Sequence, residues 1–541
     1  MIQDQLHHCN HPSLQHSVPS NPPPRTHSPP PFPTMLSTVL SALTSALSRL
    51  STFTFLQWST ILLAGLVTAI LYEQISYQIK KKHLPGPAYT IPFVGGIIAM
   101  VRAPYHFWHS QMALGPISWN AIIGQYFVMV TDAEAVRRTF KSVSERMPLI
   151  LHPNAELLLG KDNIAFLNGD EHRHLKHSLL PLFTQTALST YLAIQEKHIR
   201  HMLTQWQAES KLTGPTAGIE MRPRIYDLNT TTSMSVFVGP YLTPELLRQL
   251  QDDYTALTVG ILGFPLYVPG TKVWKGKKAA DRIIAELTVV AGQAKRRIAS
   301  GAEPTCLVDY WMVNLVKQIA EAETSGAPPP AHSSDLEVAK IILDFLFASQ
   351  DASTSSLTFT VHLLNEHNDV FQKVREEQDR LRPDKSIAIT WDVLQSMSYT
   401  RQVMREILRL RPPATIVPHI AKDSFKINDS YTAPSGSLII PSVYSSNRVG
   451  FSNPESFDPE RWSDARGEEK KYGENFATFG YGPHVCMGQR YAMNHIMLFI
   501  CLLVGECDMV RKQTETMNDI IYLPTIYPAD GVVLESLKAR K

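Results

Sequence analysis

The chain has 541 residues, of which 44% are hydrophobic and 18% charged, and its formal net charge is +2. A chain of this length and composition can bury a large core, and its near-neutral charge excludes the basic footprint of a nucleic-acid-binding protein. The five cysteines are sparse and form no CxxC pair. The sequence therefore indicates neither a disulfide framework nor a structural zinc site, a redox dithiol or a covalently attached c-type haem.

Residues 1–34 are predicted to form a disordered tail. Nine prolines between Pro12 and Pro33 are interleaved with Ser, His and Asn. This composition cannot bury enough apolar surface to offset the entropy of the chain. Met35 follows directly, so translation from this methionine would remove the tail.

Residues 53–72 are predicted to be a single transmembrane anchor. The run has 20 residues without a charge, which matches the roughly 20 residues that a helix needs to cross a bilayer. A signal peptide is the first alternative, but the run is long and lacks a small-residue cleavage site; a buried core helix is the second. Lys80, Lys81, Lys82 and His83 follow, and such a positive cluster stays in the cytosol. We therefore expect the main body to be cytosolic.

The body is expected to span residues 84–541. Leu84-Pro85-Gly86-Pro87 breaks any helix and is predicted to be a stiff hinge. Beyond it helical periodicity dominates and strand-like stretches are short, which predicts a mainly α fold with small β-sheets, of the α+β class. Helices are expected at 186–208, 335–365, 370–382 and 401–411, and strands at 127–131, 425–427, 437–440 and 532–534.

The segment 479–488 carries the most informative cysteine. Gly480 and Gly482 allow positive φ and close approach to a planar ligand, and an amphipathic helix pattern opens after Gly488. Cys486 thus lies just before a helix N-terminus, where free amides and the helix dipole favour the thiolate. A lone thiolate in such a loop suits one axial bond to haem iron. The alternative is a glycine turn that covers a buried cysteine.

This segment resembles the haem-binding loop of the cytochromes P-450, Phe-x-x-Gly-x-Arg/His-x-Cys-x-Gly. The pattern is met at Phe479, Gly482, His484, Cys486 and Gly488. The resemblance implies haem b (iron protoporphyrin IX), with Cys486 as its thiolate ligand, His484 at a propionate, and the residues Phe479, Gly480 and Gly488 around the cofactor.

Further motifs of the family follow the same order. Glu406 and Arg409 resemble its Glu-x-x-Arg helix, and Arg461 resembles the arginine that completes a structural triad with them. By the same resemblance His419 is a second propionate-binding group. An exposed salt bridge is the alternative for Glu406 and Arg409, since pairs three residues apart are common on helices.

Two more cofactor contacts are implied by the segment 169–176. It resembles the family helix that grips the propionates, with His172 and Lys176 in place of the usual Trp and Arg. A lysine keeps the charge but loses the bidentate geometry of arginine. The alternative is an exposed basic helix face.

The helix expected at 335–365 opens with a capping box, Ser334 to Glu337. Its middle carries a polar cluster between apolar flanks, and polar residues inside a buried helix usually line water or a ligand. The family pattern there ends in Asp/Glu-Thr-Thr/Ser; this chain keeps the acid as Asp351 but has Ala352 where the family has threonine. Ser353, Ser349 or an ordered water is then expected to assist Asp351 in proton delivery; the alternative is a different proton route.

This helix, the cysteine loop and residues 412–421 and 522–528 are most similar to the sterol C-22 desaturase branch of the family. The loop at 146–166 is apolar and is predicted to roof the substrate pocket, with Phe264 and Leu266 at its entrance. By the resemblance, the pocket is expected to include Ala348, Phe166, Thr525 and Ile526. An apolar cavity of this kind suits a rigid lipid.

The resemblance implies an oxidoreductase that uses dioxygen and electrons from NADPH to form the C22–C23 double bond of a sterol. The electron donor is expected to be an NADPH-cytochrome reductase, with a b-type cytochrome as a second candidate, at the endoplasmic reticulum membrane. One alternative is a hydroxylase or demethylase of the same superfamily acting on another lipid. An alternative of a different class is a non-catalytic, membrane-tethered protein that binds haem or a sterol.

Overall fold

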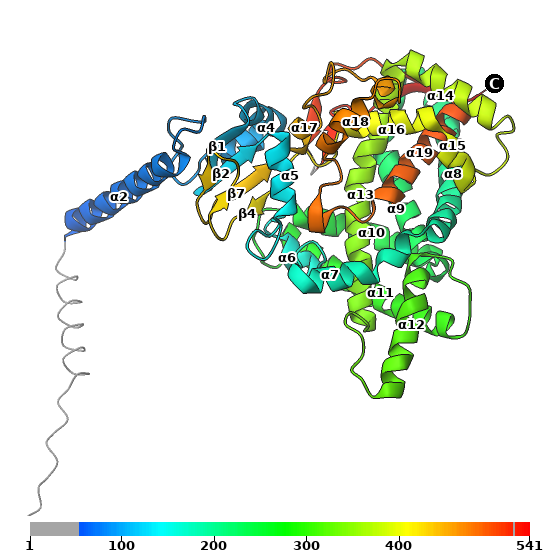
Figure 1. Cartoon of the computed structure of the whole chain (residues 1–541), viewed down its shortest axis with the longest axis horizontal. Coiled ribbons are helices and arrows are strands. Elements are labelled where there is room, and N and C mark those ends of the chain that lie inside the picture. The colour runs from blue at the N-terminus through cyan, green and yellow to red at the C-terminus, as the bar shows by residue number, and fades with distance from the viewer. Residues whose placement is uncertain (1–53, 523–524, 541) are drawn as a thin grey trace, which may run out of the picture. The chain divides into compact units, whose positions relative to one another are not determined.

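A computed structural model describes residues 54–522 and 525–540, so the predicted 1–34 tail lies outside the described residues. The chain divides into two compact units, residues 1–69 and 70–541. The described part of the first unit belongs to helix α2, Phe55–Lys81 (Figure 1), which is long and apolar enough to cross a membrane and whose apolar window contains no buried residue. This agrees with the predicted membrane anchor.

The C-terminal part of α2 belongs to the second unit and packs against its sheet. The Tyr77 ring is buried and lies 6.0 Å from the Trp119 ring and 6.1 Å from the Tyr126 ring. The Glu73 carboxylate accepts hydrogen bonds from the backbone amide of Phe93, at 3.0 Å, and from the Tyr77 hydroxyl, also at 3.0 Å. Residues 73–77 are therefore fixed to the body.

The predicted hinge at residues 84–87 is docked as well. The backbone amide of Trp119 donates to the carbonyl oxygen of Pro85 at 3.0 Å. A Cβ on Gly86 would lie 2.3 Å from the Trp119 carbonyl oxygen, so only glycine allows this approach. The segment therefore lies along the edge of the sheet. The two prolines keep its backbone extended, and the glycine allows close contact with Trp119.

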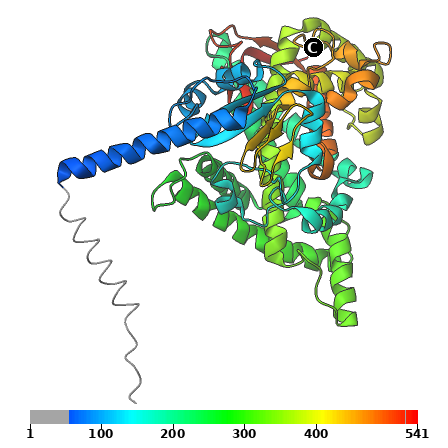
Figure 2. The ribbon, with the colours of Figure 1, turned by 60° about the vertical axis from the view of Figure 1, so that its left-hand side comes forward.

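The N-terminal part of this unit contributes two strands to a four-stranded sheet. Its order is β1 (Ile117–Ile122), β2 (Gln125–Val130), β7 (Leu438–Pro441) and β4 (His419–Ile420). The β2 and β7 strands are parallel, with Phe127 opposite Leu438, and they lie side by side in Figure 1 and in Figure 2. This pairing joins segments that are about 300 residues apart in the sequence.

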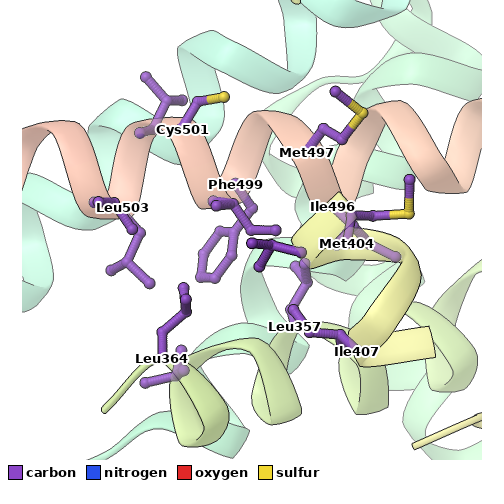
Figure 3. Packing of buried hydrophobic residues seen from close by; sticks show 14 of the residues in the cluster. Leu357, Leu364, Met404, Ile407, Ile496, Met497, Phe499, Cys501 and Leu503 are labelled. Atoms are coloured by element: carbon purple, nitrogen blue, oxygen red, sulfur yellow. The ribbon is translucent and has the colours of Figure 1, made fainter. Parts of the chain in front are cut away.

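The helical body is built around α13, Asp335–Glu366. Apolar side chains of α13, α16 (Ser398–Leu410) and α19 (Gln489–Glu506) meet in one buried cluster. Figure 3 shows part of this packing, with Leu357 and Leu364 from α13, Met404 and Ile407 from α16, and Ile496 and Phe499 from α19. The burial of these side chains fixes α13 at the centre of the fold.

The other elements surround this core. Within the described residues, the remaining helices of eight or more residues are α4 (Pro104–Met112), α5 (Ala133–Lys141), α7 (Gly169–Ser178), α8 (Gln185–Ala217), α9 (Met221–Val238), α10 (Pro244–Ile261), α11 (Lys272–Ala299), α12 (Leu307–Ser325) and α14 (Asn368–Leu381). In a three-stranded sheet β11 (Val533–Ala539) lies between β3 (Ile219–Glu220) and β8 (Cys507–Arg511). Two further pairs join β9 (Ile520–Tyr522) with β10 (Ile526–Pro528) and β5 (Phe425–Lys426) with β6 (Thr432–Ala433). The predicted mainly helical class with small sheets is confirmed.

Candidate functional site

The loop that carries Cys486 is held against α5 by its backbone. Gly482 has φ 73°, and a Cβ there would lie 2.8 Å from the Cα of Lys141. The backbone amide of Cys486 donates to the carbonyl oxygen of Phe479 at 2.9 Å. The loop is therefore closed on itself and pressed onto α5 where no side chain fits, which fixes the cysteine ahead of α19.

The Cys486 side chain is exposed, although protein atoms surround it and burial raises the pKa of its thiol. The amides of Gly488 and Gln489 and the ammonium of Lys176 act on this pKa in the opposite direction. An accessible sulfur enclosed by protein lines an internal space. Helix amides and a cation beside the sulfur oppose this rise in pKa, an arrangement that suits a thiolate bound to a metal centre.

Four basic side chains gather beside the loop. The Lys176 ammonium donates to the carbonyl oxygens of Pro483, at 2.6 Å, and of Val485, at 3.1 Å. The rings of His172 and His484 stack with centroids 3.9 Å apart. Burial, followed by the positive charges of His172, Lys176 and His419, lowers the pKa of His484 to about 4.

This basic cluster fits an anionic cofactor. Among the described residues no carboxylate forms an ion pair with any of the four, and the buried Nδ1 of His419 has no hydrogen-bond partner. Burial lowers the pKa values of His172, His419 and His484, so these rings are neutral near pH 7 and offer N–H donors, whereas Lys176 offers a positive charge. The two propionate groups of haem b would accept those hydrogen bonds and pair with that charge, and the cysteine sulfur beside the cluster would bind its iron, so the residues present fit the predicted haem.

Glu406 lies at the centre of a buried ion-pair group. Its carboxylate accepts from Arg409 Nε at 2.8 Å and from Arg461 Nε at 2.9 Å, and all three side chains are inaccessible to solvent. The indole N–H of Trp462 and the amide of Asp458 each add a hydrogen bond of 3.0 Å. Such a group fixes the segments that it joins, because losing one member leaves buried charges unpaired.

On α13, Ala348 and Ala352 are exposed whereas most neighbouring side chains are buried or half-buried. The two residues are one turn apart and share a face, so this face borders open space. Asp351 lies beside them, and burial raises the pKa of its carboxyl to about 6. The carbonyl oxygen of Asp351 accepts from the Tyr527 hydroxyl at 3.1 Å, which ties the helix to β10.

The predicted serines lie on other sides of α13. The Ser349 hydroxyl donates to the hydroxyl of Ser233 on α9 at 3.0 Å, and Ser353 is buried. One turn on, Thr354 accepts from the amide of Asn229, at 2.9 Å, in the same interface. The polar cluster therefore serves two faces: Asp351 beside the open face, and Ser349 and Thr354 toward α9. The roles of the two serines in proton delivery stay predictions.

The predicted roof segment borders a cavity of about 810 Å³. Phe166, Leu149, Ile150 and Leu151 line it, whereas the other predicted pocket residues, Ala348, Thr525 and Ile526, do not. The Thr525 hydroxyl donates to the carbonyl oxygen of Asp351 at 3.4 Å, and the Ile526 side chain is buried in the core. Phe264 and Leu266, expected at the entrance, are exposed.

One contact of the roof segment was missed by sequence reasoning. The carboxylate of Asp344 on α13 accepts from the backbone amide of Ile164 at 3.2 Å and from the side-chain amide of Asn163. Burial raises the pKa of Asp344 well above its usual range. An acid inside an otherwise apolar helix segment was the available signal, since such a group needs a partner.

Comparison with known proteins agrees with this geometry. The family described as "Cytochrome P450" matches residues 85–534. "Cytochrome P450 710A2" of Arabidopsis thaliana is 41% identical over 476 residues, 87% of this chain and 94% of the relative. "C-22 sterol desaturase erg5" of Aspergillus fumigatus is 34% identical over 85% of this chain and 91% of the relative.

A solved structure shows the same fold. The "Retinoic acid bound cyanobacterial CYP120A1" superposes with a TM-score of 0.70 and covers 83% of this chain and 98% of its own. Its sequence is 22% identical to this one, so the likeness concerns the fold alone.

Proposed function

The chain belongs to the cytochrome P450 family, and on this premise we propose that it introduces the C22–C23 double bond into the side chain of a sterol. The family implies an oxidoreductase with a haem-thiolate cofactor, a substrate and a redox partner. The narrower activity is supported by relatives whose names state it, at 34% identity over most of both chains.

The observation that carries the proposal is the open face of α13. Ala352 stands where the family resemblance leads one to expect threonine, beside Asp351, whose pKa of about 6 suits proton exchange near neutral pH. An alanine offers no hydroxyl at the reacting position. On α13, Asp351 is the titratable side chain next to Ala352.

Cys486 would bind the haem iron, and His484, His172, Lys176 and His419 would hold its propionates. When bound, the haem supplies the activation of dioxygen by two electrons, chemistry that no side chain offers. In the balanced reaction C22 and C23 each lose one hydrogen, and dioxygen takes up these two hydrogens, two electrons and two protons to give two waters. Asp351 would pass protons at its carboxyl oxygens, and the apolar walls would orient the sterol side chain.

The surroundings of the enzyme are part of the proposal. Helix α2 would anchor the chain as a single pass in the endoplasmic reticulum membrane, with the catalytic unit in the cytosol beside its lysine-rich end. Electrons would come from an NADPH-cytochrome reductase, or in part from a b-type cytochrome.

Reconstitution of the full chain with purified reductase, NADPH and a C22-saturated sterol tests this function. We expect a sterol with one new side-chain double bond, identified by mass spectrometry and proton NMR. A hydroxylated or demethylated product without the alkene would contradict the proposal and favour another lipid oxidation of the same family. A Cys486→Ser variant, which lacks the thiolate, is the negative control.

A further inference from the structure

A second cavity lies apart from the cysteine loop and from the cavity beneath the roof segment. It has a volume of about 630 Å³ and opens between the N-terminus of α4 and strand β9. It shares no lining residue with the first cavity. Its walls combine apolar residues, among them Pro104 and Ile520, with two arginines, Arg102 and Arg411.

Arg411 lines this cavity without any acceptor for its side chain. Within residues 54–522 and 525–540 its guanidinium makes no hydrogen bond or ion pair, and its buried Nε has no partner. Its guanidinium lies 5.7 Å from the Phe359 ring, and the charge of Glu455 acts on it without an ion pair between the two. Nearby Arg448, by contrast, pairs with Glu455 at 2.7 Å. An arginine carries five donors and stays charged, so Arg411 presents an unmet demand for oxygen acceptors.

The mouth of the cavity adds positive potential. Arg102 is exposed at the end of α3, Ile97–Arg102, and Ala103 separates it from the start of α4 at Pro104. The first turn of α4 has no acidic residue and no capping side chain, and Pro104 has no N–H, so the free amides there are those of Tyr105 and His106, two residues that line the cavity. One carboxylate, that of Asp519, lines the same cavity, and in the described part of the chain it forms no ion pair. With two arginines and one carboxylate among its lining residues, the cavity carries a net positive charge.

We propose that this cavity binds the phosphate group of a phosphate ester. The Arg411 guanidinium would take two phosphate oxygens in a bidentate contact, and Arg102 with the first amides of α4 would take the others. Donors that approach from three elements suit a group with several oxygens. The volume and the apolar walls leave room for an organic part, since cavities of this size hold whole small molecules.

The test uses the full-length protein in detergent micelles and isothermal titration calorimetry with three probes. These are inorganic phosphate, glycerol 3-phosphate and dihexanoyl phosphatidate, the last a water-soluble lipid. We expect at least one ester to bind about tenfold more tightly than inorganic phosphate, which corresponds to about 1.4 kcal/mol. A preference for phosphatidate identifies a lipid headgroup, and equal binding of both esters identifies a soluble ester. If inorganic phosphate binds as tightly as both esters, the proposal is overturned.

Variants locate the binding. Arg411→Gln should weaken the preferred ester at least tenfold, and Arg102→Gln, at an exposed position, should weaken it about threefold. Asp519→Asn should tighten binding, because it removes the one acid of the cavity. Arg248→Gln, a mutation of an arginine 70% exposed elsewhere, is the matched control and should change nothing. Unchanged affinity in both Arg411→Gln and Arg102→Gln, or weaker binding in Asp519→Asn, would refute the site.

Discussion

The ammonium of Lys176 lies 2.6 Å from the carbonyl oxygen of Pro483, so α7 is tied directly to the loop that presents Cys486. The same ammonium also donates to the carbonyl oxygen of Val485, and its charge opposes the rise that burial causes in the pKa of the Cys486 thiol. One side chain thus links the helix that carries His172 to the position and charge of the proposed iron ligand.

Replacement of Lys176 by Met should loosen the proposed haem site. Two charge-assisted hydrogen bonds to the loop disappear, each worth about 1.5–3 kcal/mol, and the pKa of Cys486 rises because a neighbouring positive charge is lost. We expect haem to dissociate at least tenfold faster, and a larger share of the carbon-monoxide complex to lack thiolate ligation by absorption spectroscopy. Arg173→Gln, on the same helix but exposed, is the control. Equal spectra for both variants would contradict the role of Lys176.

Glu406→Ala should destabilise the fold strongly. Arg409 and Arg461, both fully buried, would lose their shared carboxylate, and breaking a buried ion pair costs about 3–5 kcal/mol. The measurement is urea unfolding followed by circular dichroism. Glu474→Ala removes an exposed partner 4.0 Å from Arg137 and should cost less than about 1 kcal/mol. Similar losses of unfolding free energy in both variants would show that burial does not determine the contribution of the Glu406 ion pairs to stability.

Asp351→Asn should stabilise the folded protein near neutral pH and should also lower the rate of sterol turnover. The fold raises the pKa of Asp351 from 3.8 to about 6, so the folded state holds a proton that the unfolded state releases. Stability therefore falls as pH rises from about 4 to 6, and the full penalty, about 3 kcal/mol, persists above that window. The variant should match the wild type at pH 4 and exceed it at pH 7.5 in urea unfolding.

Turnover provides the second measurement on Asp351. If its carboxyl passes protons, Asp351→Asn should lower sterol turnover by about 10²-fold. Asp252→Asn, at an exposed position, is the control. Normal turnover in Asp351→Asn would remove this residue from the proposed proton route.

Ala352→Thr tests why the open face of α13 lacks a hydroxyl. Ala352 is exposed, so threonine can be accommodated, and its hydroxyl would stand next to Asp351. We expect the ratio of hydroxylated to desaturated sterol to rise, measured by gas chromatography of the products. Ala348→Ser, one turn away on the same face, is the comparison. A constant ratio in Ala352→Thr would mean that residue 352 does not select the outcome.

The sequence determined the features that depend on neighbouring residues. The sequence predicts a helix at 335–365 and α13 runs over Asp335–Glu366, because its capping box, Ser334 with Glu337, and its apolar periodicity act locally. The cysteine loop was found for the same reason, since its glycines and the helix start lie within ten residues. Resemblance to the family motifs, which occur in the expected order along the chain, also identified Glu406, Arg461 and Cys486 as site residues.

Only the tertiary structure decided what distant segments do together. The parallel pairing of β2 with β7, the stacking of His172 on His484 and the docking of Pro85 beside Trp119 each join residues far apart in sequence. Residues 84–87, expected to be a hinge, are held at the edge of the same sheet by the hydrogen bond between Trp119 and Pro85. Arg411 is the clearest example, because nothing in its sequence neighbourhood marks it. Only the arrangement of the surrounding helices, strands and cavity shows that its guanidinium lacks an acceptor. Short strands and unpaired charges depend on long-range packing, which local propensity does not encode.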